Sequence, residues 1–454
     1  MPPKFGTSGL RGLVVDLTAE LVASYVRAFV TKCPVGTGLF VARDLRPSSP
    51  DIAQMVIDAG QAAGCAVTDC GAVPTPALAL AAMDAGAAAV MVTGSHIPAD
   101  RNGLKFYTPD GEITKDHETA ILGALDTPRP DLAGPDVVQN TTAGAVYVAR
   151  YTAAFGAAAL AGMTIGVYSH STVGRDLLMD ILRQSGARVI ELGRSDRFVP
   201  VDTEAVDTAT RAQLMAWAKT HKTDAIVSMD GDGDRPLLTD AAGMVVPGDV
   251  LGQITGAYLG ADIAVTPVSS NTGAQTVFGR VVRTRIGSPY VIAGMDAAGG
   301  RVVGYEANGG FLLGFAAKRL APLMTRDSVL PMLVPLVLAR TQGVAAVVAT
   351  QPARFTAADR LQDVPTNMSK ALIARLGSNA AARRDFLAQL GGVSAGIDTT
   401  DGLRITLTDG RIIHLRPSGN APECRFYAEA ATTQRAVATL AAGLDALRHS
   451  LGLK

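Results

Sequence analysis

The first 95 residues carry two hydrophobic periods in alternation. Short apolar runs typical of strands occupy residues 38–44, 66–71 and 87–95. Apolar positions recur with the period of a helix over residues 49–64 and 75–86. Thr75 is expected to cap the second of these helices, with Pro76 in the first position and Gly86 at the end. Strands that alternate with helices of this length predict βαβ units and a mostly parallel sheet.

The same alternation recurs twice further along the chain. The second set has strands predicted at residues 163–169, 187–193 and 224–234, with helices at 173–185 and 208–221. The third has strands predicted at residues 261–269, 280–288 and 301–310, with helices at 248–259 and 289–298. Each set ends in a polar loop with glycine after a strand, which indicates a threefold structural repeat.

The C-terminal part follows a different pattern. Residues 402–419 alternate apolar and polar positions around an Asp-Gly pair, which predicts a β-hairpin, and an Ala- and Leu-rich helix is predicted over 432–450. We therefore predict an α/β protein whose first three domains are related mixed α/β units and whose fourth is α+β. The expected domains are residues 1–145, 146–245, 246–350 and 351–454.

Composition narrows the class of protein. Among 454 residues, 41 Lys and Arg balance 41 Asp and Glu, so no net charge attracts nucleic acid or an anionic membrane. No apolar run approaches the ~18 residues that span a bilayer, and the N-terminus lacks the apolar segment of a signal peptide. The four cysteines form no CxxC motif and are expected to be reduced thiols. These features predict a cytoplasmic protein with no nucleic-acid or membrane partner.

The segment MDGDGDRP places Asp230, Asp232 and Asp234 at alternate positions after a predicted strand. Residues two apart in extended chain point the same way, and the intervening glycines let the backbone approach an ion. Hard oxygen ligands of this number suit Mg²⁺ completed by a phosphate oxygen. An EF-hand is excluded, because its sixth and twelfth positions would be Arg235 and Ala241 instead of Gly and Glu. A solvated acidic turn is the alternative, although three carboxylates without a cation would repel one another.

The loop of residues 416–425 offers a phosphate site. Arg416 can bind a phosphate through two parallel hydrogen bonds, while Ser418, Asn420 and the backbone of Gly419 add donors. The alternative is a plain turn after the hairpin.

A third loop, residues 304–314, offers groups for a sugar. Glu306 and Asn308 lie on one side of an extended stretch, where they could bind neighbouring hydroxyls. A glycine-rich turn with Glu306 in an ion pair is the alternative.

The segment TGSHIP, residues 93–98, sets a hydroxyl beside an imidazole at the end of an apolar run. Ser95 is a candidate nucleophile, and His96 or Lys105 a candidate acid/base. A hydrolase triad is not indicated, because triad partners usually lie far apart in the chain and the GxSxG motif is absent. A helix cap for Ser95 and a packing role for His96 are the alternatives.

We interpret these four segments together. A nucleophilic hydroxyl, a Mg²⁺ site, a loop that binds phosphate and a loop that binds sugar hydroxyls imply phosphoryl transfer on a sugar phosphate. A phosphorylated Ser95 would carry roughly −1.5 to −2 charges and would require a divalent cation and cationic side chains nearby. Arg11, Lys105 and Arg235 are the candidates for the cationic side chains.

These motifs resemble those of the α-D-phosphohexomutase family, the phosphomannomutase/phosphoglucomutase group, in the order and over the length of that family. They are KFGTSGLRG (4–12), TGSHIP (93–98), NGLK (102–105), DGDGDR (230–235), GYEANGG (304–310) and RPSGNAPECR (416–425). The resemblance implies four domains around a central cleft.

The resemblance also implies roles for the residues. Ser95 would carry the phosphoryl group, with Mg²⁺ held by a phosphoserine oxygen and by Asp230, Asp232 and Asp234. His96 and Lys105 resemble the acid/base candidates, with Arg11 and Arg235 stabilising charge on the transferring group. Glu306 and Asn308 would bind the sugar's 3- and 4-hydroxyls, and the non-reacting phosphate would be held by Arg416, Ser418, Gly419, Asn420 and Arg425.

The chain departs from the usual family motifs at several positions. Gly94 and Ile97 replace Ala and Asn of TASHNP, and Asn420 stands where Thr is frequent. Gly310 stands where the sugar loop of many members ends in His, with Asn308 in place of Ser, so one ligand for the sugar is lost. Ser288 aligns with a histidine of some members, which leaves acid/base help from that side in doubt.

The sugar loop EANGG resembles that of members assigned as phosphomannomutases. We therefore expect mannose 6-phosphate and mannose 1-phosphate to interconvert through phospho-Ser95 and a hexose 1,6-bisphosphate, which would also act as activator. A phosphoglucomutase or a bispecific enzyme is the alternative, since a 2-hydroxyl epimer changes one hydrogen bond worth about 0.5–1.5 kcal/mol. A Mg²⁺-dependent phosphatase with Asp230 as nucleophile and an inactive sugar-phosphate binder are further alternatives. The expected partners are small sugar phosphates, and the chain is expected to be a monomer or a homodimer.

Overall fold

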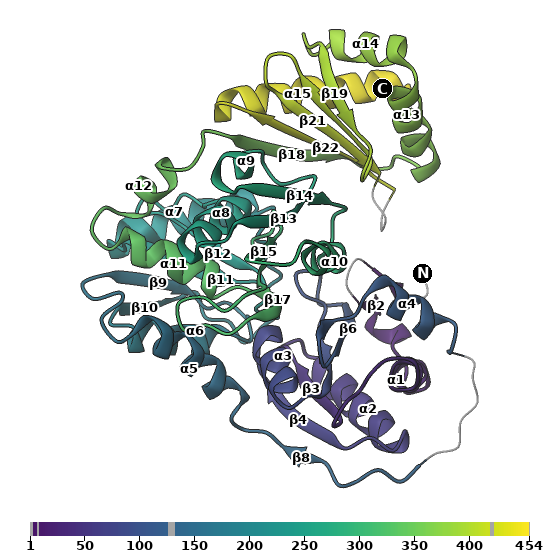
Figure 1. Ribbon diagram of the computed structural model, residues 1–454, viewed down its shortest axis with the longest axis vertical. Coiled ribbons are helices and arrows are strands. Elements are labelled where there is room, and N and C mark those ends of the chain that lie inside the picture. Colours follow the sequence, from purple (N-terminus) through teal and green to yellow (C-terminus); the bar gives the residue numbers. More distant parts are fainter. Residues whose placement is uncertain (1–2, 7–8, 126–131, 418–421, 454) are drawn as a thin grey trace. The chain divides into compact units, whose positions relative to one another are not determined.

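The computed structural model describes residues 3–6, 9–125, 132–417 and 422–453 (Figure 1). The chain divides into two compact units, which are described separately. The first contains residues 1–264 and 287–350, and the second contains residues 265–286 and 351–454.

The first sheet is built around parallel strands, as the βαβ pattern predicts. β3 (Leu39–Arg43) pairs in parallel with β4 (Val67–Ala72) and β5 (Ala88–Val92), and β6 (Arg101–Thr108) runs antiparallel to β5. The outer strands are β1 (Lys4–Phe5), β2 (Leu10–Leu13), β7 (Gly111–Glu112) and β8 (Val138–Gln139). The helices are α1 (Ala19–Lys32), α2 (Ser49–Ala62), α3 (Thr75–Asp84) and α4 (Lys115–Leu122), with a 3₁₀ turn at Val14–Asp16.

One predicted cap is wrong. The N-cap of α3 is Pro74, and Thr75 is already the first residue of the helix. The Thr75 hydroxyl is used elsewhere, since it donates to Asp232 Oδ2 at 2.6 Å.

The second sheet repeats this arrangement. β9 (Thr164–Tyr168) pairs in parallel with β10 (Arg188–Leu192) and β11 (Ala225–Met229), and β12 (Pro236–Leu238) runs antiparallel to β11. The accompanying helices are α5 (Ala143–Phe155), α6 (Arg175–Gln184) and α7 (Thr208–His221). The strand order β10-β9-β11-β12 matches the order β4-β3-β5-β6 of the first sheet.

A third set of elements follows the same order along the chain: strand, helix, strand, helix and two strands. Its members are β13 (Ile263–Pro267), α9 (Ala274–Val277), β14 (Arg280–Thr284), α10 (Ser288–Ala298), β15 (Val302–Tyr305) and β16 (Phe311–Leu313). Also present are α8 (Gly248–Leu259), β17 (Leu323–Asp327), α11 (Leu330–Ala339) and α12 (Val344–Ala349). Within the first unit, β15, β16 and β17 pair antiparallel. The predicted threefold repeat is therefore present in the order of elements.

The second unit contains the α+β domain. Its five strands are all antiparallel, in the order β18 (Phe355–Leu361), β22 (Cys424–Ala430), β21 (Ile412–Pro417), β20 (Leu403–Leu407) and β19 (Ser394–Asp398). The predicted hairpin is formed by β20 and β21, and the predicted C-terminal helix is α15 (Thr433–Leu451), which lies against β18 and β22 (Figure 1). α13 (Thr366–Ser378) and α14 (Ala380–Ala388) complete the domain.

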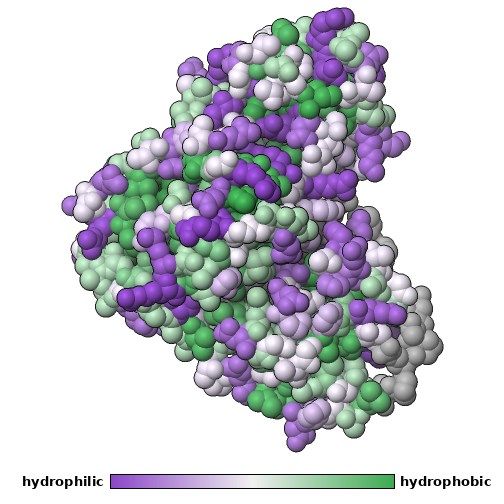
Figure 2. Space-filling model, viewed as in Figure 1, coloured by the Kyte–Doolittle hydropathy of each residue, from purple (hydrophilic) through white to green (hydrophobic). Residues whose placement is uncertain are grey.

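Apolar side chains from both faces of the strands fill the cores, whereas polar and apolar side chains are interspersed over the surface in view (Figure 2). Among the described helices, none combines the length and the apolar composition that a membrane crossing requires. The loops after β5, β11 and β15 leave the carboxyl ends of their strands, where open α/β sheets bind ligands.

Candidate active site

Ser95 lies in the first loop, three residues beyond the end of β5. It is 1% exposed, and its backbone has a positive φ of 53°, which is uncommon for a residue other than glycine. Its N–H donates to Thr93 Oγ1 at 2.7 Å, and its Oγ donates to Asp230 Oδ2 at 2.7 Å. The loop thus directs the hydroxyl at the acidic segment after β11, and positive φ of this kind is typical of functional sites.

A buried arginine holds this loop in place. Arg46 donates through NH2 to the carbonyl oxygens of Ser95 (2.9 Å) and Ile97 (2.6 Å), and through NH1 to those of Pro98 (2.7 Å) and Arg101 (3.0 Å). The sequence analysis missed Arg46. The available signal was its place just after the predicted strand 38–44, since β3 is parallel to β5 and both strands end at the same edge of the sheet.

The guanidinium of Arg46 also explains why Gly94 suits this loop. A Cβ at Gly94 would lie 2.6 Å from Arg46 Cζ, closer than real Cβ atoms approach their neighbours. On another side, Phe198 covers the same guanidinium, with its ring centroid 4.0 Å from Cζ.

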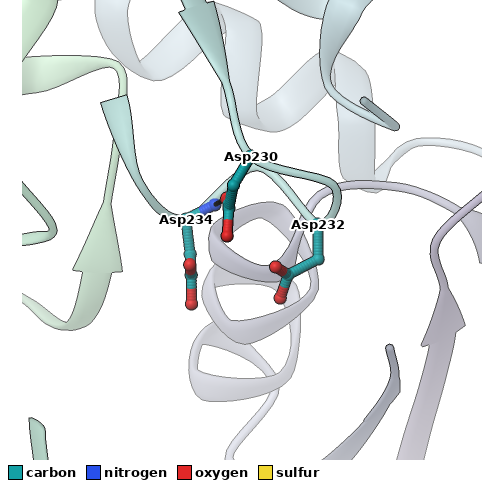
Figure 3. Close-up of side chains that lie close together, drawn as sticks. All are labelled: Asp230, Asp232 and Asp234. Atoms are coloured by element: carbon teal, nitrogen blue, oxygen red, sulfur yellow. Dashed lines mark hydrogen bonds between the residues drawn. The ribbon is translucent and has the colours of Figure 1, made fainter. Parts of the chain in front are cut away.

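Asp230, Asp232 and Asp234 converge after β11, as predicted. All three are fully buried, and each offers an oxygen within 4.8 Å of the others (Figure 3). Their carboxylates project to the same side of the loop (Figure 3). Asp232 Oδ1 and Asp234 Oδ1 have no hydrogen-bond partner among the described residues, although buried polar atoms normally have one. Unsatisfied buried carboxylate oxygens that face one another fit a metal ion.

Lys105, on β6, lies against two of these carboxylates. Its Nζ is 2.5 Å from Asp232 Oδ2 and 2.6 Å from Asp234 Oδ2. Arg235 Nε lies 3.9 Å from Asp230 Oδ2 and 3.8 Å from Asp234 Oδ1. Lys105 and Arg235, two of the three predicted cations, therefore both lie against the predicted metal ligands.

Arg11, on β2, completes a group of cations. Burial, followed by the charges of Arg235 and Arg326, lowers the pKa of Arg11 to about 10. Arginines crowd together in this way where an anion is to be bound, because their mutual repulsion is then offset.

Burial and the two neighbouring carboxylates raise the pKa of Asp230 to about 8. Burial alone would also raise the pKa of Asp232, but the charge and hydrogen bond of Lys105 hold it below the ordinary value. A buried site that disfavours the charge of its third carboxylate favours a cation.

His96 is neutral in this environment. Its Nδ1 accepts from Arg235 NH1 at 3.0 Å and lies 3.3 Å from Ser95 Oγ. Burial, followed by the charge of Arg235, lowers the pKa of His96 to about 3. The imidazole therefore has little capacity to take up a proton near neutral pH.

The sugar loop after β15 is buried and well ordered by its own hydrogen bonds. The side-chain Oδ1 atom of Asn308 accepts a hydrogen bond from Gly310 N at 3.0 Å. The backbone carbonyl of Asn308 accepts another from Thr203 Oγ1 at 3.1 Å. Glu306 Oε2 lies 3.9 Å from NH1 of Arg326 on β17, a residue that the sequence analysis also missed. Glu306 and Asn308 are both buried in this loop, and hydrogen bonds to Gly310 and Thr203 already use two oxygen atoms of Asn308.

In the second unit, Arg416 and Arg425 lie directly opposite one another on β21 and β22. Arg416 Nε donates to Asp401 Oδ1 at 3.0 Å, and Arg425 NH2 is 3.9 Å from Glu423 Oε2. Like charges directly opposite on a sheet repel, and here the carboxylate beside each arginine offsets part of that repulsion. The predicted phosphate ligands Ser418, Gly419 and Asn420 lie outside the described residues.

Four family models match almost the whole chain. They describe domains I, II and III and the C-terminal domain of phosphoglucomutase/phosphomannomutase, and they match residues 2–130, 145–243, 247–355 and 354–447.

Full-length relatives agree with the family models. A phosphomannomutase of Sinorhizobium fredii (strain NBRC 101917 / NGR234) is 45% identical over 99% of this chain and 100% of its own. A phosphomannomutase of Salmonella muenchen is 44% identical over 99% of this chain and 96% of its own. A phosphoglucosamine mutase of Kineococcus radiotolerans is 31% identical over 99% of both chains.

Solved structures share the fold. A phosphoglucomutase/phosphomannomutase family protein of Burkholderia thailandensis superposes with a TM-score of 0.80 at 20% identity, covering 98% of this chain and 97% of its own. The phosphoglucomutase pp63/parafusin of Paramecium gives a TM-score of 0.75 at 16% identity, covering 100% and 97%. The predicted fold class and family resemblance are confirmed, and the chain belongs to the phosphoglucomutase/phosphomannomutase family.

Proposed function

We propose that the protein interconverts mannose 6-phosphate and mannose 1-phosphate. Family membership makes the chain a mutase, and the relatives at 45% and 44% identity over nearly its full length are phosphomannomutases. The observation that carries the proposal is the 2.7 Å hydrogen bond from Ser95 Oγ to Asp230 Oδ2. It brings a hydroxyl that can carry a phosphoryl group onto a buried acidic triad that can hold a cation.

The cation proposed for the triad is Mg²⁺. Hard oxygen ligands and a site close to a phosphate favour Mg²⁺, and the Oδ1 atoms of Asp232 and Asp234, which accept no hydrogen bond from the described residues, could bind it. Bound there, the ion would neutralise charge on the transferring phosphoryl group. Asp230, beside Ser95, and the phosphoserine itself would complete the ligands.

In the reaction proposed, the bond between phosphorus and Ser95 Oγ breaks as a substrate hydroxyl oxygen attacks phosphorus, and that hydroxyl loses its proton to a base. His96 and Lys105 are the candidates for this base: the His96 Nδ1 atom accepts from Arg235, and the Lys105 ammonium, paired with Asp232 and Asp234, would first have to give up a proton. Arg11 and Arg235 would stabilise charge on the phosphoryl group. The resulting hexose 1,6-bisphosphate turns over, and its other phosphoryl group returns to Ser95.

Substrate recognition is assigned to the remaining loops. Glu306 and Asn308 would bind sugar hydroxyls, and the non-reacting phosphate would be held by Arg416, Ser418, Gly419, Asn420 and Arg425. We keep residues 145, 245 and 350 as the proposed domain boundaries. All four cysteines are free thiols, which supports a reducing compartment such as the cytoplasm. We also propose that the protein is a monomer or a homodimer.

A coupled assay tests the proposal. The purified protein is given mannose 1-phosphate or glucose 1-phosphate with Mg²⁺ and a trace of hexose 1,6-bisphosphate as activator, and formation of the 6-phosphate is followed. We expect a higher kcat/KM with mannose 1-phosphate. A higher value with glucose 1-phosphate would assign a phosphoglucomutase instead, and release of inorganic phosphate without isomerisation would assign a phosphatase.

A further inference from the structure

Arg326, at the end of β17, lies among carboxylates from three separate segments. It is 2% exposed, and its NH2 is 2.9 Å from Oδ2 of Asp234, in the loop after β11 that carries the acidic triad. Its Nε is 3.3 Å from Glu112 Oε1 on β7, and its NH1 is 3.9 Å from Oε2 of the sugar-loop residue Glu306. The guanidinium therefore lies between the metal loop (residues 230–235) and the sugar loop (residues 304–314), close to Asp234 and at a longer ion-pair distance from Glu306.

The two residues that follow this arginine fix the end of β17 to its surroundings. Asp327 accepts hydrogen bonds from the hydroxyls of Tyr147 (2.7 Å) and Tyr151 (2.5 Å). Ser328 Oγ donates to the carbonyl oxygen of Gly233, inside the metal loop, at 2.7 Å. The backbone that carries the guanidinium is thus bonded to the loop that its side chain contacts, which leaves little freedom for either.

The side chain of Arg326 also fills the space beside Gly310. A Cβ at Gly310 would lie 2.9 Å from both Cγ and Cδ of Arg326 and 3.2 Å from its Cβ. On the other side, buried Ser288 donates to Glu112 Oε2 at 2.5 Å, and Glu112 is the second carboxylate beside Arg326. Arg326 therefore lies against Gly310 on one side and against Glu112, the partner of Ser288, on the other.

Resting on the proposed mutase function, we propose that Arg326 is a positioning residue that holds the metal ligand Asp234 and the sugar reader Glu306 in one fixed relation. It also occupies the space that any side chain at position 310 would need. The planar guanidinium suits the task because it presents several donors in a rigid fork and is always charged.

The two carboxylates depend on Arg326 to different extents. Asp234 keeps a second cation, because Lys105 Nζ is 2.6 Å from its Oδ2 atom. For Glu306, no other Lys, Arg or His nitrogen lies within 4.0 Å in the part of the chain that the structure describes. Loss of Arg326 should therefore disturb binding of the sugar more than binding of the ion.

The test combines Arg326→Ala, Gly310→His and the double variant in the assay with mannose 1-phosphate. For Arg326→Ala we expect kcat/KM to fall about 100-fold, as displacements of about 1 Å do, with a rise in KM. The Mg²⁺ concentration for half-maximal activity should rise about 10-fold, the lower end for loss of a group that orients a metal ligand.

The double variant gives the sharpest outcome. Gly310→His alone should be damaging, because its side chain has no space while Arg326 is present. Added to Arg326→Ala, the same substitution should raise kcat/KM about 10-fold, because a histidine then fills the space and restores a polar partner for Glu306. If the loss of kcat/KM in the double variant equals the product of the losses in the two single variants, the proposal is overturned. It is also overturned if Arg326→Ala has the kcat/KM of the wild type.

Two controls separate the proposal from loss of folding and from a wrong function. Arg183→Ala removes a side chain that is 52% exposed and should leave kcat/KM and the melting temperature unchanged. Arg326→Lys keeps the charge without the fork, and we expect activity between those of the wild type and Arg326→Ala at a melting temperature near that of the wild type. A wild type that converts neither sugar phosphate refutes the proposed function and this inference together, whereas an active wild type matched by Arg326→Ala refutes the inference alone.

Discussion

Replacing Lys105 with methionine should reveal how the acidic triad is balanced. Methionine keeps most of the length of the side chain and removes the ammonium group that lies 2.5 Å from Asp232 Oδ2 and 2.6 Å from Asp234 Oδ2. All the charged side chains in these contacts are at most 6% exposed, so water cannot take over the role of the ammonium.

The size of the effect follows from these distances. At an effective dielectric constant of about 20, two unit charges about 2.5 Å apart attract by about 6–7 kcal/mol. Most of that attraction offsets the loss of hydration, and breaking a buried pair by removing one partner costs about 3–5 kcal/mol. Arg326 remains within 2.9 Å of Asp234, so the uncompensated charge after the substitution falls mainly on Asp232.

The measurement is chemical unfolding of the wild type and of Lys105→Met, with EDTA and across a Mg²⁺ titration. In EDTA we expect the variant to lose about 3–5 kcal/mol in the transition that includes the site. Because Lys105 and Mg²⁺ compete for the same carboxylates, the variant should bind the ion at least as tightly as the wild type, although its turnover is lost. An ion present at 100 times its Kd adds about 2.7 kcal/mol, so Mg²⁺ should recover much of the lost stability.

Lys115→Met is the matched control, since its partner Glu118 lies on the surface and the two side chains are 34% and 21% exposed. That pair should contribute only about 0–1 kcal/mol. If Lys105→Met is as stable in EDTA as Lys115→Met, or if it binds Mg²⁺ more weakly than the wild type, the competition between lysine and ion is refuted.

Three further predictions address other parts of the molecule. Ser95→Ala should abolish isomerisation and should gain no phosphoryl group in intact-protein mass spectrometry after incubation with hexose 1,6-bisphosphate. If Ser95→Ala is nearly harmless while Asp230→Asn abolishes a covalent phosphate, the phosphatase alternative is correct. Arg46→Met removes the hydrogen bonds to four carbonyl oxygens of the Ser95 loop and the buried ion pair with Asp44 (3.2 Å), so it should lower kcat about 100-fold and also lower the melting temperature; wild-type kcat would contradict the clamp. Burial lowers the pKa of His414 from 6.5 to about 4, so its contribution to stability is fully present above pH 6.5 and is lost as the pH falls toward 4. The loss should reach about 3 kcal/mol, and unfolding measured from pH 7 to 4 should show a flatter dependence for His414→Gln; an equal slope in both proteins would contradict this reading.

The sequence predicted what depends on local pattern. Strand ends could be located from apolar runs, and a parallel sheet sets such ends at one edge, so Ser95 could be expected to face a ligand site. The alternating aspartates could be expected to converge because residues two apart in extended chain point the same way. Both expectations describe short segments whose geometry their own residues decide.

The contacts that the sequence analysis missed join residues far apart in the chain. Thr75 looked like a helix cap because a hydroxyl before a helix usually caps it, yet the hydroxyl donates to Asp232, 157 residues away. Arg46 and Arg326 are single arginines in unremarkable surroundings, and only the folded chain shows which carbonyl or carboxylate oxygens surround them. The hydrophobic periodicity of a single sequence does not show which distant residues will contact one another.

The geometry around Ser95 also implies that phosphoserine and metal ion depend on one another. In the unphosphorylated protein, Ser95 Oγ donates a proton to Asp230, so the hydroxyl and the carboxylate attract. Phosphorylation removes that proton and sets roughly two negative charges against a buried acid whose pKa is already raised to about 8 by burial and its neighbours. A phosphate oxygen and the Asp230 carboxylate would then repel one another, and a divalent cation between them or a proton on Asp230 would offset that repulsion. Under the proposed function, an ion at the triad would therefore favour a phosphoryl group on Ser95, and Lys105 would balance part of the acidic charge when the ion is absent.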